Sequence, residues 1–240
     1  PISRADSEIY AEDVEKVVNS SQAVNLATNR LIIHNVTREF IVDGVGDITE
    51  PIGLSGSRLE VSSLIIDVFA PHVKSVIRAV EIAGGKISGV VFNPLLASRA
   101  ALSKMQKNLG VVVIDIGFGT TGYAVFEENK LVATGLIPLG AGNITNDIAV
   151  GLKIQAAAAE NLKLHYGYAL AKEVGSKETI ELKKFSSEER GAVSRRFVSE
   201  IIESRLAEIL EFIDNDLRSI GKAGKLAGGA VLVGGGAKIP

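Results

Sequence analysis

The pattern of apolar and polar positions in the first part of the chain changes between helical and strand spacing. Val14, Val17 and Val18 recur on one helical face, after the acidic Glu12 and Asp13 that suit a helix start. Later apolar runs are bounded by Gly, Pro and Asp, which is typical of strands joined by turns. The pattern predicts a helix over 11–22, strands over 31–42 and 58–69, turns between them at Asp43, Gly44, Pro51, Gly53 and Gly56, a helix opened by Pro71 and ended by Gly84 and Gly85, and a further strand before residue 92.

Beyond residue 92 the order of the expected elements changes. Apolar residues recur at helical spacing from Val193 to Ile220, which predicts a long amphipathic helix, and Ser186 with Glu189 forms a capping-box pattern at its start. The pattern predicts a connecting helix over 94–107, a hairpin over 111–126, a strand over 131–137, helices over 144–152 and 154–166, a polar stretch with weak strand potential over 173–184, a helix over 187–220, and a strand over 230–233.

Composition places the chain among globular proteins. Its 240 residues are 46% apolar and 22% charged, enough for one large or two small domains with real cores. The net charge of −2 gives no sign of nucleic acid or an anionic membrane as the main partner. The chain has no cysteine, which excludes disulfides and thiolate metal sites, and its three histidines lack ligand spacing.

The ends of the chain indicate a fragment. No uninterrupted apolar run approaches the roughly 18 residues of a membrane span, and no signal peptide is visible. The chain starts at Pro1 rather than Met and stops at Pro240, just after a glycine cluster. We therefore expect it to be part of a longer protein.

The hairpin over 111–126 carries the most informative chemistry. Glycines in its turn allow backbone N–H groups to approach an anion, and threonine hydroxyls add donors. A carboxylate at the end of the first strand can hold a metal ion through water. An ordinary hairpin shows the same glycine pattern, so the turn alone is a weak signal. The candidate residues are Asp115, Gly117, Gly119, Thr120 and Thr121.

Three other segments each allow a functional and a structural interpretation. Gly140 to Asn143 precede a helix, where a phosphate or an ordinary asparagine cap fits equally well. Glu160 and Lys163 share a helical face, and a surface ion pair is the simpler interpretation of that spacing. The glycines at 234–236 follow an apolar strand and let a flat ring or a phosphate approach the backbone, although they also suit a plain turn.

Together these segments resemble the actin-like ATPase family, and within it the FtsA family of bacterial cell-division proteins. Residues 113–121 resemble its second phosphate hairpin, 140–149 its connecting helix, and 231–237 its adenosine turn. The narrower likeness to FtsA rests on residues 39–44 and 51–60, and on Asn143, Thr145, Asp147 to Ala149, Ala159, Glu160, Lys163, Tyr166, Gly167, Ala169, Ile202, Glu203 and Arg205.

The resemblance implies an α/β (α+β) protein with an actin-like, ribonuclease H-like fold and an FtsA-type subdomain 1C. It covers essentially the whole chain. The subdomains it implies are 1C over 1–92, a connecting helix left from subdomain IA over 93–108, the first part of IIA over 109–150, IIB over 151–225, and the second part of IIA over 226–240.

The resemblance also implies the roles of the site residues. ATP and Mg²⁺ are the expected cofactors, with Asp115 organising the metal ion through water. Glu160 and Lys163 would face the ribose, the glycines at 234–236 the adenine, and Gly117, Gly119, Thr120, Thr121, Gly142 and Asn143 the phosphates. Arg190, Arg195 and Arg196 are candidates to meet acidic residues of a partner tail, although a solvated helix face explains them equally well.

The implied function is a scaffold rather than an enzyme, with weak ATPase activity left open. Such a protein assembles head to tail into filaments and tethers the FtsZ ring, through the FtsZ C-terminal tail, to the inner face of the cytoplasmic membrane at the division site. Head-to-tail contacts that do not close give filaments, which suits that role. No nucleic acid is expected, and the membrane would be reached only through a C-terminal helix that this chain lacks.

Three departures from the family pattern stand beside the resemblance. Phe118 occupies a position where the family usually has glycine. The chain lacks most of subdomain IA with its first phosphate hairpin, and it lacks the C-terminal membrane helix. Two alternatives remain: a PilM-like pilus-assembly protein, and a small-molecule kinase of the same superfamily, for which no group orienting a nucleophile is evident.

Overall fold

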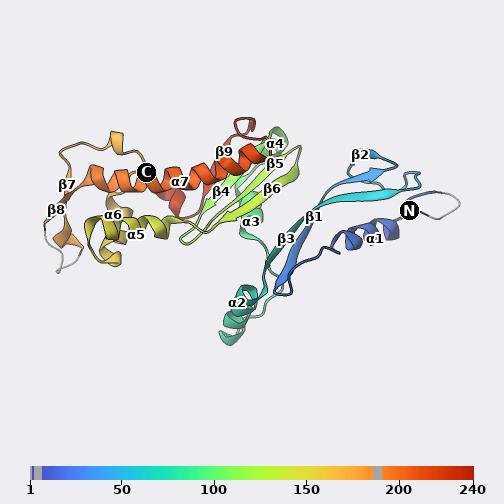
Figure 1. Cartoon of the computed structure of the whole chain (residues 1–240), viewed down its shortest axis with the longest axis horizontal. Coiled ribbons are helices and arrows are strands. Elements are labelled where there is room, and N and C mark those ends of the chain that lie inside the picture. The colour runs from blue at the N-terminus through green and yellow to red at the C-terminus, as the bar shows by residue number, and fades with distance from the viewer. Residues whose placement is uncertain (1, 3–6, 186–190) are drawn as a thin grey trace. The chain divides into compact units, whose positions relative to one another are not determined.

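The structure is a computed structural model, and it describes residue 2, residues 7–185 and residues 191–240. The chain divides into two compact units (Figure 1). The first comprises residues 1–96 with Lys130–Ala133, and the second comprises residues 97–129 and 134–240. Each unit has its own sheet, and each is treated by itself.

The first unit is built on a three-stranded antiparallel sheet in the order β2-β1-β3. Its strands are β1 (Arg30–Val42), β2 (Val45–Ile48) and β3 (Leu59–Phe69), and helix α1 (Ala11–Ser21) packs against them. Buried Ile9, Phe40, Val42 and Leu59 form the core, with Val14, Val17 and Val18 packed on it. The apolar pattern over 11–22, 31–42 and 58–69 therefore predicted these elements correctly.

Strand β2 was missed because its sequence is short and rich in turn residues. The β1–β2 turn places Asp43 at φ 46° and Gly44 at φ 86°. Two successive positive φ angles match the twist of an antiparallel hairpin, and Asp-Gly is a pair that tolerates them. The Asp43 carboxylate also accepts the backbone N–H groups of Ser57 and Arg58 at 3.0 and 2.8 Å, which ties the hairpin to the start of β3.

Helix α2 (Ala70–Ile82) follows β3, with proline in its first turn and Gly84 at φ 84° just after its end. The strand expected before residue 92 is absent from this described segment, since residues 85–92 form no ladder. Instead the Phe92 N–H donates to Nε2 of His34 on β1 at 2.9 Å.

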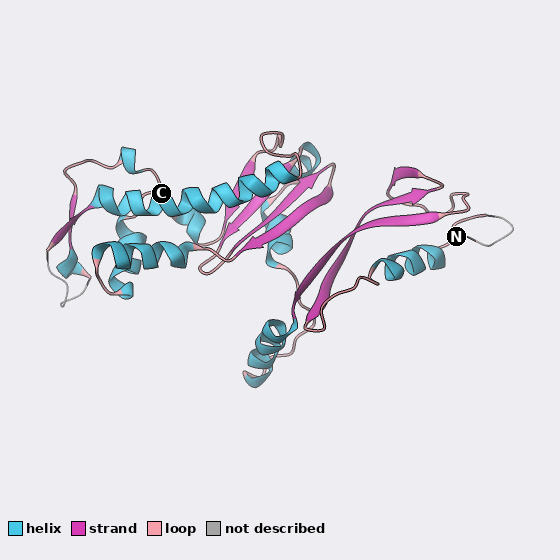
Figure 2. Cartoon of the chain, viewed as in Figure 1, coloured by secondary structure: helices cyan, strands magenta, loops and turns pink. Residues whose placement is uncertain are grey.

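The sheet of the second unit has four strands in the order β6-β5-β4-β9 (Figure 2). They are β4 (Val111–Ile116), β5 (Thr121–Glu127), β6 (Lys130–Ile137), of which residues 130–133 are counted with the first unit, and β9 (Ala230–Val233). Strands β4 and β5 form the predicted antiparallel hairpin, with Ile116 opposite Thr121. Strand β9 returns parallel to β4, with Asp115 opposite Val233. This pairing brings the C-terminal glycines to the same sheet end as the hairpin turn.

The connecting helix expected over 94–107 is two helices, α3 (Asn93–Ala101) and α4 (Lys104–Leu109). Ser103 interrupts it, because its side chain caps α4 by accepting the N–H of Gln106 at 3.2 Å, and the Gln106 side chain accepts the Ser103 N–H at 2.9 Å. This reciprocal capping box starts a new helix where periodicity alone suggested a continuous one.

Three helices make up the rest of the second unit: α5 (Ala141–Leu152), α6 (Ala156–Tyr166) and α7 (Arg195–Ser219). The segment between α6 and α7 contains the short strands β7 (Thr179–Glu181) and β8 (Ala192–Ser194) and the 3-10 turns η1 (Ala171–Glu173) and η2 (Leu182–Lys184). The apolar faces of these elements meet in one buried cluster of Ile144, Ile148, Ala159, Leu162, Ile180, Leu182, Val198 and Ile202.

Helix α7 starts later than its apolar periodicity predicts. Ser194 is its N-cap and accepts the Phe197 N–H, while Val193 belongs to β8 and pairs with Ile180. The predicted start at 187 is therefore wrong. The capping-box residues Ser186 and Glu189 lie outside the described residues.

Two polar contacts hold α7 against the rest of its unit. The Tyr123 hydroxyl on β5 donates to Asp216 at 2.8 Å, and burial together with this hydrogen bond raises the pKa of Tyr123. Arg205 makes a two-point contact with Asp147 on α5, at 2.6 and 2.9 Å. Because Tyr123 is buried and Arg205 half-buried, these directional contacts fix the position of the helix in addition to its apolar packing.

The buried cluster should decide the stability of the second unit. Ile148→Ala removes a side chain with no exposed surface and should lower the free energy of unfolding by about 2–5 kcal/mol, because it leaves a cavity. Val150→Ala, two residues away on the same helix but 69% exposed, should cost less than about 0.5 kcal/mol. Urea denaturation of both variants measures the difference, and equal losses would contradict the assigned core.

Candidate nucleotide-binding cleft

Four segments of the second unit meet around a cleft of about 370 Å³. They are the hairpin turn between β4 and β5, the first turn of α5, the middle of α6, and the glycine turn after β9. The lining residues are Gly117, Phe118, Ala141, Glu160, Lys163, Leu164, Gly235, Gly236, Lys238, Ile239 and Pro240. Segments that the sequence singled out separately therefore come together in one place.

The hairpin turn is closed by the Gly117 N–H, which donates to the Thr120 carbonyl at 2.9 Å. Gly119 has no neighbouring atom within 4 Å of where a Cβ would lie, and Thr120 is exposed. Both residues therefore present backbone and hydroxyl groups to solvent at the end of the sheet, as a phosphate-binding turn requires.

The side chain of Thr121 has a different place from the one expected. It is fully buried, and its hydroxyl donates to the Leu139 carbonyl at 2.8 Å. This hydroxyl supports the loop before α5 from inside and does not reach the cleft.

The hairpin turn is docked on the N-terminus of α5. The Ala141 N–H donates to the Gly117 carbonyl at 2.8 Å, and the Gly142 N–H donates to the Phe118 carbonyl at 2.6 Å. These two donors are among the four that a helix start leaves without intrahelical partners. A Cβ at Gly142 would lie 2.8 Å from the Phe118 ring, so glycine is needed for the close approach.

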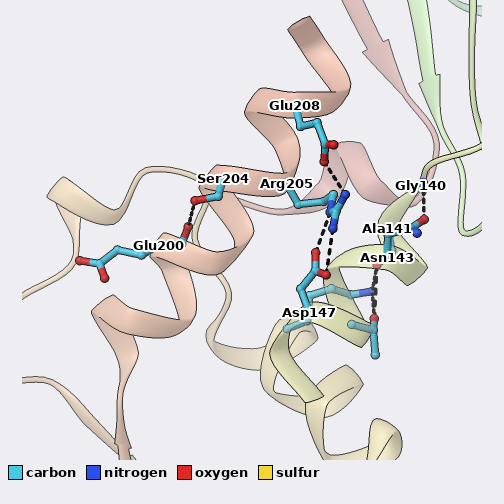
Figure 3. Close-up of polar contacts among 10 residues, drawn as sticks. Gly140, Ala141, Asn143, Asp147, Glu200, Ser204, Arg205 and Glu208 are labelled. Atoms are coloured by element: carbon cyan, nitrogen blue, oxygen red, sulfur yellow. Dashed lines mark hydrogen bonds and ion pairs between the residues drawn. The ribbon is translucent and has the colours of Figure 1, made fainter. Parts of the chain in front are cut away.

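The start of α5 follows the capping interpretation rather than the phosphate interpretation. Asn143 accepts the Gly140 N–H on its side-chain Oδ1 at 2.9 Å (Figure 3). The Gly142 N–H and the Asn143 Oδ1 are therefore used in contacts that position the hairpin and cap the helix. The nucleotide contacts expected of these two residues stay a prediction.

Glu160 and Lys163 form a buried network rather than a surface ion pair. Lys163 is 4% exposed, and its Nζ donates to the Ala141 carbonyl at 3.0 Å, to Thr145 Oγ1 at 2.8 Å and to Glu160 Oε2 at 2.7 Å. Thr145 in turn donates to Glu160. All three protons of the ammonium group have acceptors, which a charge at this depth needs.

This network lowers the pKa of Glu160. Burial by itself would raise that pKa, but the hydrogen bonds from Lys163 and Thr145 and the nearby positive charge outweigh burial. Both side chains line the cleft, but the Glu160 carboxylate is one-third exposed, whereas Lys163 is almost fully buried and holds α6 to the first turn of α5.

The glycine turn after β9 forms the opposite wall of the cleft. Gly234 has φ 89°, and a Cβ there would collide with the Asp115 carboxylate and come within 2.5 Å of the Ile116 carbonyl. A Cβ at Gly236, in the 3-10 turn η3 (Gly236–Lys238), would collide with Ile116. Gly235 has open space, so its backbone is accessible from the cleft. Asp115 lies against this turn at the end of β4.

A second hollow lies between α5 and α7, with a volume of about 520 Å³. Arg205 lies at its edge, where it contacts Asp147 on one side and Glu208 on the other (Figure 3). We call it the α5–α7 groove; its lining residues are Asn146, Asp147, Val150, Gly151, Phe197, Ile201, Ser204, Arg205 and Glu208. The sequence analysis did not predict this groove. Apolar residues at helical spacing look the same in sequence whether they lie in a buried core or in the wall of a groove.

The three arginines expected to meet a partner have different places. Arg190 lies outside the described residues. Arg195 donates to the Tyr166 carbonyl at 3.0 Å and to Glu178 at 2.7 Å, so it is committed to the fold. Arg196 is exposed, with Glu200 3.6 Å away on the next turn.

Within the described part of the chain, no group of three or more His, Cys, Asp or Glu side chains could hold a metal ion directly. The same residues include no helix that is long and apolar enough to cross a membrane.

Comparison with known proteins identifies the family. The family model described as "Cell division protein FtsA" matches residues 112–240, and the one described as "SHS2 domain inserted in FTSA" matches residues 1–67. The chain belongs to the FtsA family. It is 40% identical to the FtsA of Bacillus subtilis, covering 100% of this chain and 54% of that protein, and 37% identical to the FtsA of Borreliella burgdorferi, covering 97% and 57%.

These matches confirm the FtsA resemblance, and the chain spans a little over half the length of these FtsA proteins. Solved structures confirm the actin-like fold. The PilM–PilN type IV pilus biogenesis complex matches 97% of this chain and 58% of its own, with a TM-score of 0.60 at 16% identity. MreB5 of Spiroplasma citri bound to AMPPNP matches 72% and 55%, with a TM-score of 0.57 at 19% identity.

The Glu160 network should make stability depend on pH. Since its pKa is lowered on folding, the network stabilises the protein above the ordinary carboxyl pKa of 4.5 and loses this effect as the pH falls below it. Glu160→Gln should cost about 1–3 kcal/mol at pH 7, and the difference from wild type should shrink in acid. Urea titrations at several pH values measure this.

Glu211→Gln, at an exposed position of α7, is the matched control and should change stability little at any pH. A cost for Glu160→Gln that is the same at pH 3 and pH 7 would show that the charge of Glu160 is not what the network needs.

Proposed function

We propose that this chain is the nucleotide-binding part of a cell-division scaffold that binds Mg-ATP, assembles with further copies into filaments, and tethers the FtsZ ring to the cytoplasmic membrane. The observation that carries the proposal is the meeting of the hairpin turn, Glu160 and the C-terminal glycine turn in one cleft. Its membership of the FtsA family supports the cell-division role.

The residues of the cleft fit a nucleotide. The accessible backbone of Gly235 offers a surface for a flat base, because a Cβ would otherwise occupy the open space. Glu160 can accept hydrogen bonds from a sugar, and the exposed Gly119 and Thr120 can donate to phosphate. MreB5, whose fold is similar, was solved bound to AMPPNP, which supports this assignment at the level of the fold.

Asp115 is proposed to hold Mg²⁺ through water. It is the last residue but one of the apolar strand β4, close to the hairpin turn, and the absence of a side chain at Gly234 leaves room for its carboxylate. A bound Mg²⁺ would neutralise phosphate charge, while the carboxylate would orient its water shell. We propose binding and assembly as the role of the cleft, with weak ATP hydrolysis compatible with it.

We propose the α5–α7 groove as the place where the FtsZ C-terminal tail docks. Phe197 is 44% exposed and Val150 69% exposed, so the groove offers apolar contact to an amphipathic segment. The neighbouring Arg196 is exposed and can meet an acidic residue of the tail. Arg195 is left out of this proposal because it is bonded within the fold.

The cleft should bind Mg-ATP, and a large side chain at position 235 should weaken this binding. Gly235→Leu is expected to weaken ATP binding at least tenfold, because its Cβ would enter open space in the wall of the cleft and the rest of the side chain would occupy room that the nucleotide needs. Gly89→Leu is the matched control, since Gly89 also has no neighbour within 4 Å of its Cβ position and lies outside the cleft. Isothermal titration calorimetry measures both affinities.

Asp115→Asn should remove most of the Mg²⁺ dependence of ATP affinity. The same titrations with and without Mg²⁺ test this role. An unchanged Mg²⁺ dependence would exclude Asp115 from the site, whereas wild-type protein that binds no ATP would remove the nucleotide proposal itself.

A labelled FtsZ C-terminal peptide should bind the α5–α7 groove. Phe197→Ala and Arg196→Glu should each weaken binding on the order of tenfold, through lost apolar contact and reversed charge. Arg218→Glu, at an exposed arginine of the same helix outside the groove, is the matched control. Fluorescence anisotropy measures the affinities, and equal effects of Arg196→Glu and Arg218→Glu would indicate non-specific charge attraction.

A further inference from the structure

Phe118 is an exposed aromatic residue in the wall of the cleft. Its side chain lies at the tip of the hairpin turn and is 70% exposed, although it lines the same cleft as Glu160 and Gly235. Phe118 is not among the described non-glycine residues with a positive φ, so the backbone of the turn carries a side chain there without strain. The backbone at position 118 therefore does not need glycine, and it accommodates phenylalanine.

The position of the ring is set by the docking of the hairpin on α5. The Phe118 carbonyl accepts the Gly142 N–H at 2.6 Å. The ring lies so close to α5 that position 142 has no room for a Cβ. The ring centroid also lies 5.9 Å from the ammonium nitrogen of Lys163. The ring thus lies beside the Glu160–Lys163 network, with most of its surface open to water.

The exposed apolar surface of the Phe118 ring is unfavourable in water, so a ligand that covers the ring gains binding free energy. The backbone of Phe118 is anchored at both Gly117 and Phe118 carbonyls, so a ligand has to order only the side chain and not the turn that carries it. An aromatic face beside a carboxylate suits a ligand that has both an apolar ring surface and hydroxyl groups. A nucleoside sugar is such a group.

We propose that Phe118 is a nucleotide-contacting residue whose ring packs on the sugar of the bound nucleotide and is covered by it. This inference rests on the proposed nucleotide binding and adds a contact that a glycine at this position cannot make. Phe118 then sets the affinity of the cleft through apolar contact, while Glu160 supplies the polar contact to the same sugar.

The first test compares ADP affinity among variants of the full 240-residue chain. Phe118→Ala should weaken binding on the order of tenfold, and Phe118→Tyr should retain it within about twofold, because the ring face is kept. Phe212→Ala, at an aromatic residue of α7 that is 46% exposed and outside the cleft, should leave affinity unchanged. Thermal unfolding of Phe118→Ala should match wild type, since little buried surface is lost.

The second test reports on the ring position directly. The chain contains no tryptophan, so F118W and F212W each introduce a single fluorescent reporter. Addition of ADP should shift the F118W emission to shorter wavelength and reduce its quenching by acrylamide severalfold, whereas F212W should show neither change.

The outcomes separate the two proposals. If wild-type protein shows no ADP binding by calorimetry, the nucleotide proposal fails and this inference fails with it. If wild type binds ADP but Phe118→Ala binds it equally well and the F118W emission does not move, nucleotide binding stands and the contact assigned to Phe118 is overturned.

Discussion

The cleft depends on the docking of the hairpin turn onto the first turn of α5. Backbone N–H groups that a helix leaves unpaired are satisfied by the carbonyls of Gly117 and Phe118, and the Ala141 carbonyl is in turn held by Lys163. Because a buried ammonium group needs every one of its acceptors, the network resists displacement of α5, α6 or the hairpin. The turn is thereby positioned by backbone contacts that leave its outer face accessible.

Glycine has two distinct roles around this cleft. At Gly142 and Gly234 a side chain would collide with the hairpin or with Asp115, so glycine permits close packing within the fold. At Gly119 and Gly235 nothing lies nearby, so glycine keeps backbone surface open to a ligand. Only the second kind leaves backbone open for the proposed nucleotide, and a sequence pattern does not separate the two.

The helical half of the second unit carries the groove that we propose as a docking site. Helix α7 buries Val198, Ile202, Ile209 and Ile213 on one side, and on another it forms the α5–α7 groove. The two-point contact between Arg205 and Asp147 joins the walls of that groove, so its width is set by an ion pair rather than by apolar packing alone. A groove with a fixed width suits a partner segment that orders on binding.

The sequence by itself determined most of the elements and the identity of the family. Apolar periodicity located the strands at 31–42 and 58–69 and the hairpin at 111–126, since burial imposes those spacings directly. Local capping decided two of the errors: Ser103 split the connecting helix, and Ser194 set the start of α7. Only the tertiary structure decided which candidate polar groups face the cleft. Lys163 is buried because its acceptors, Ala141 and Thr145, come from another helix, and Thr121 is turned inward by Leu139. Such partners are distant in sequence, so no local pattern specifies them.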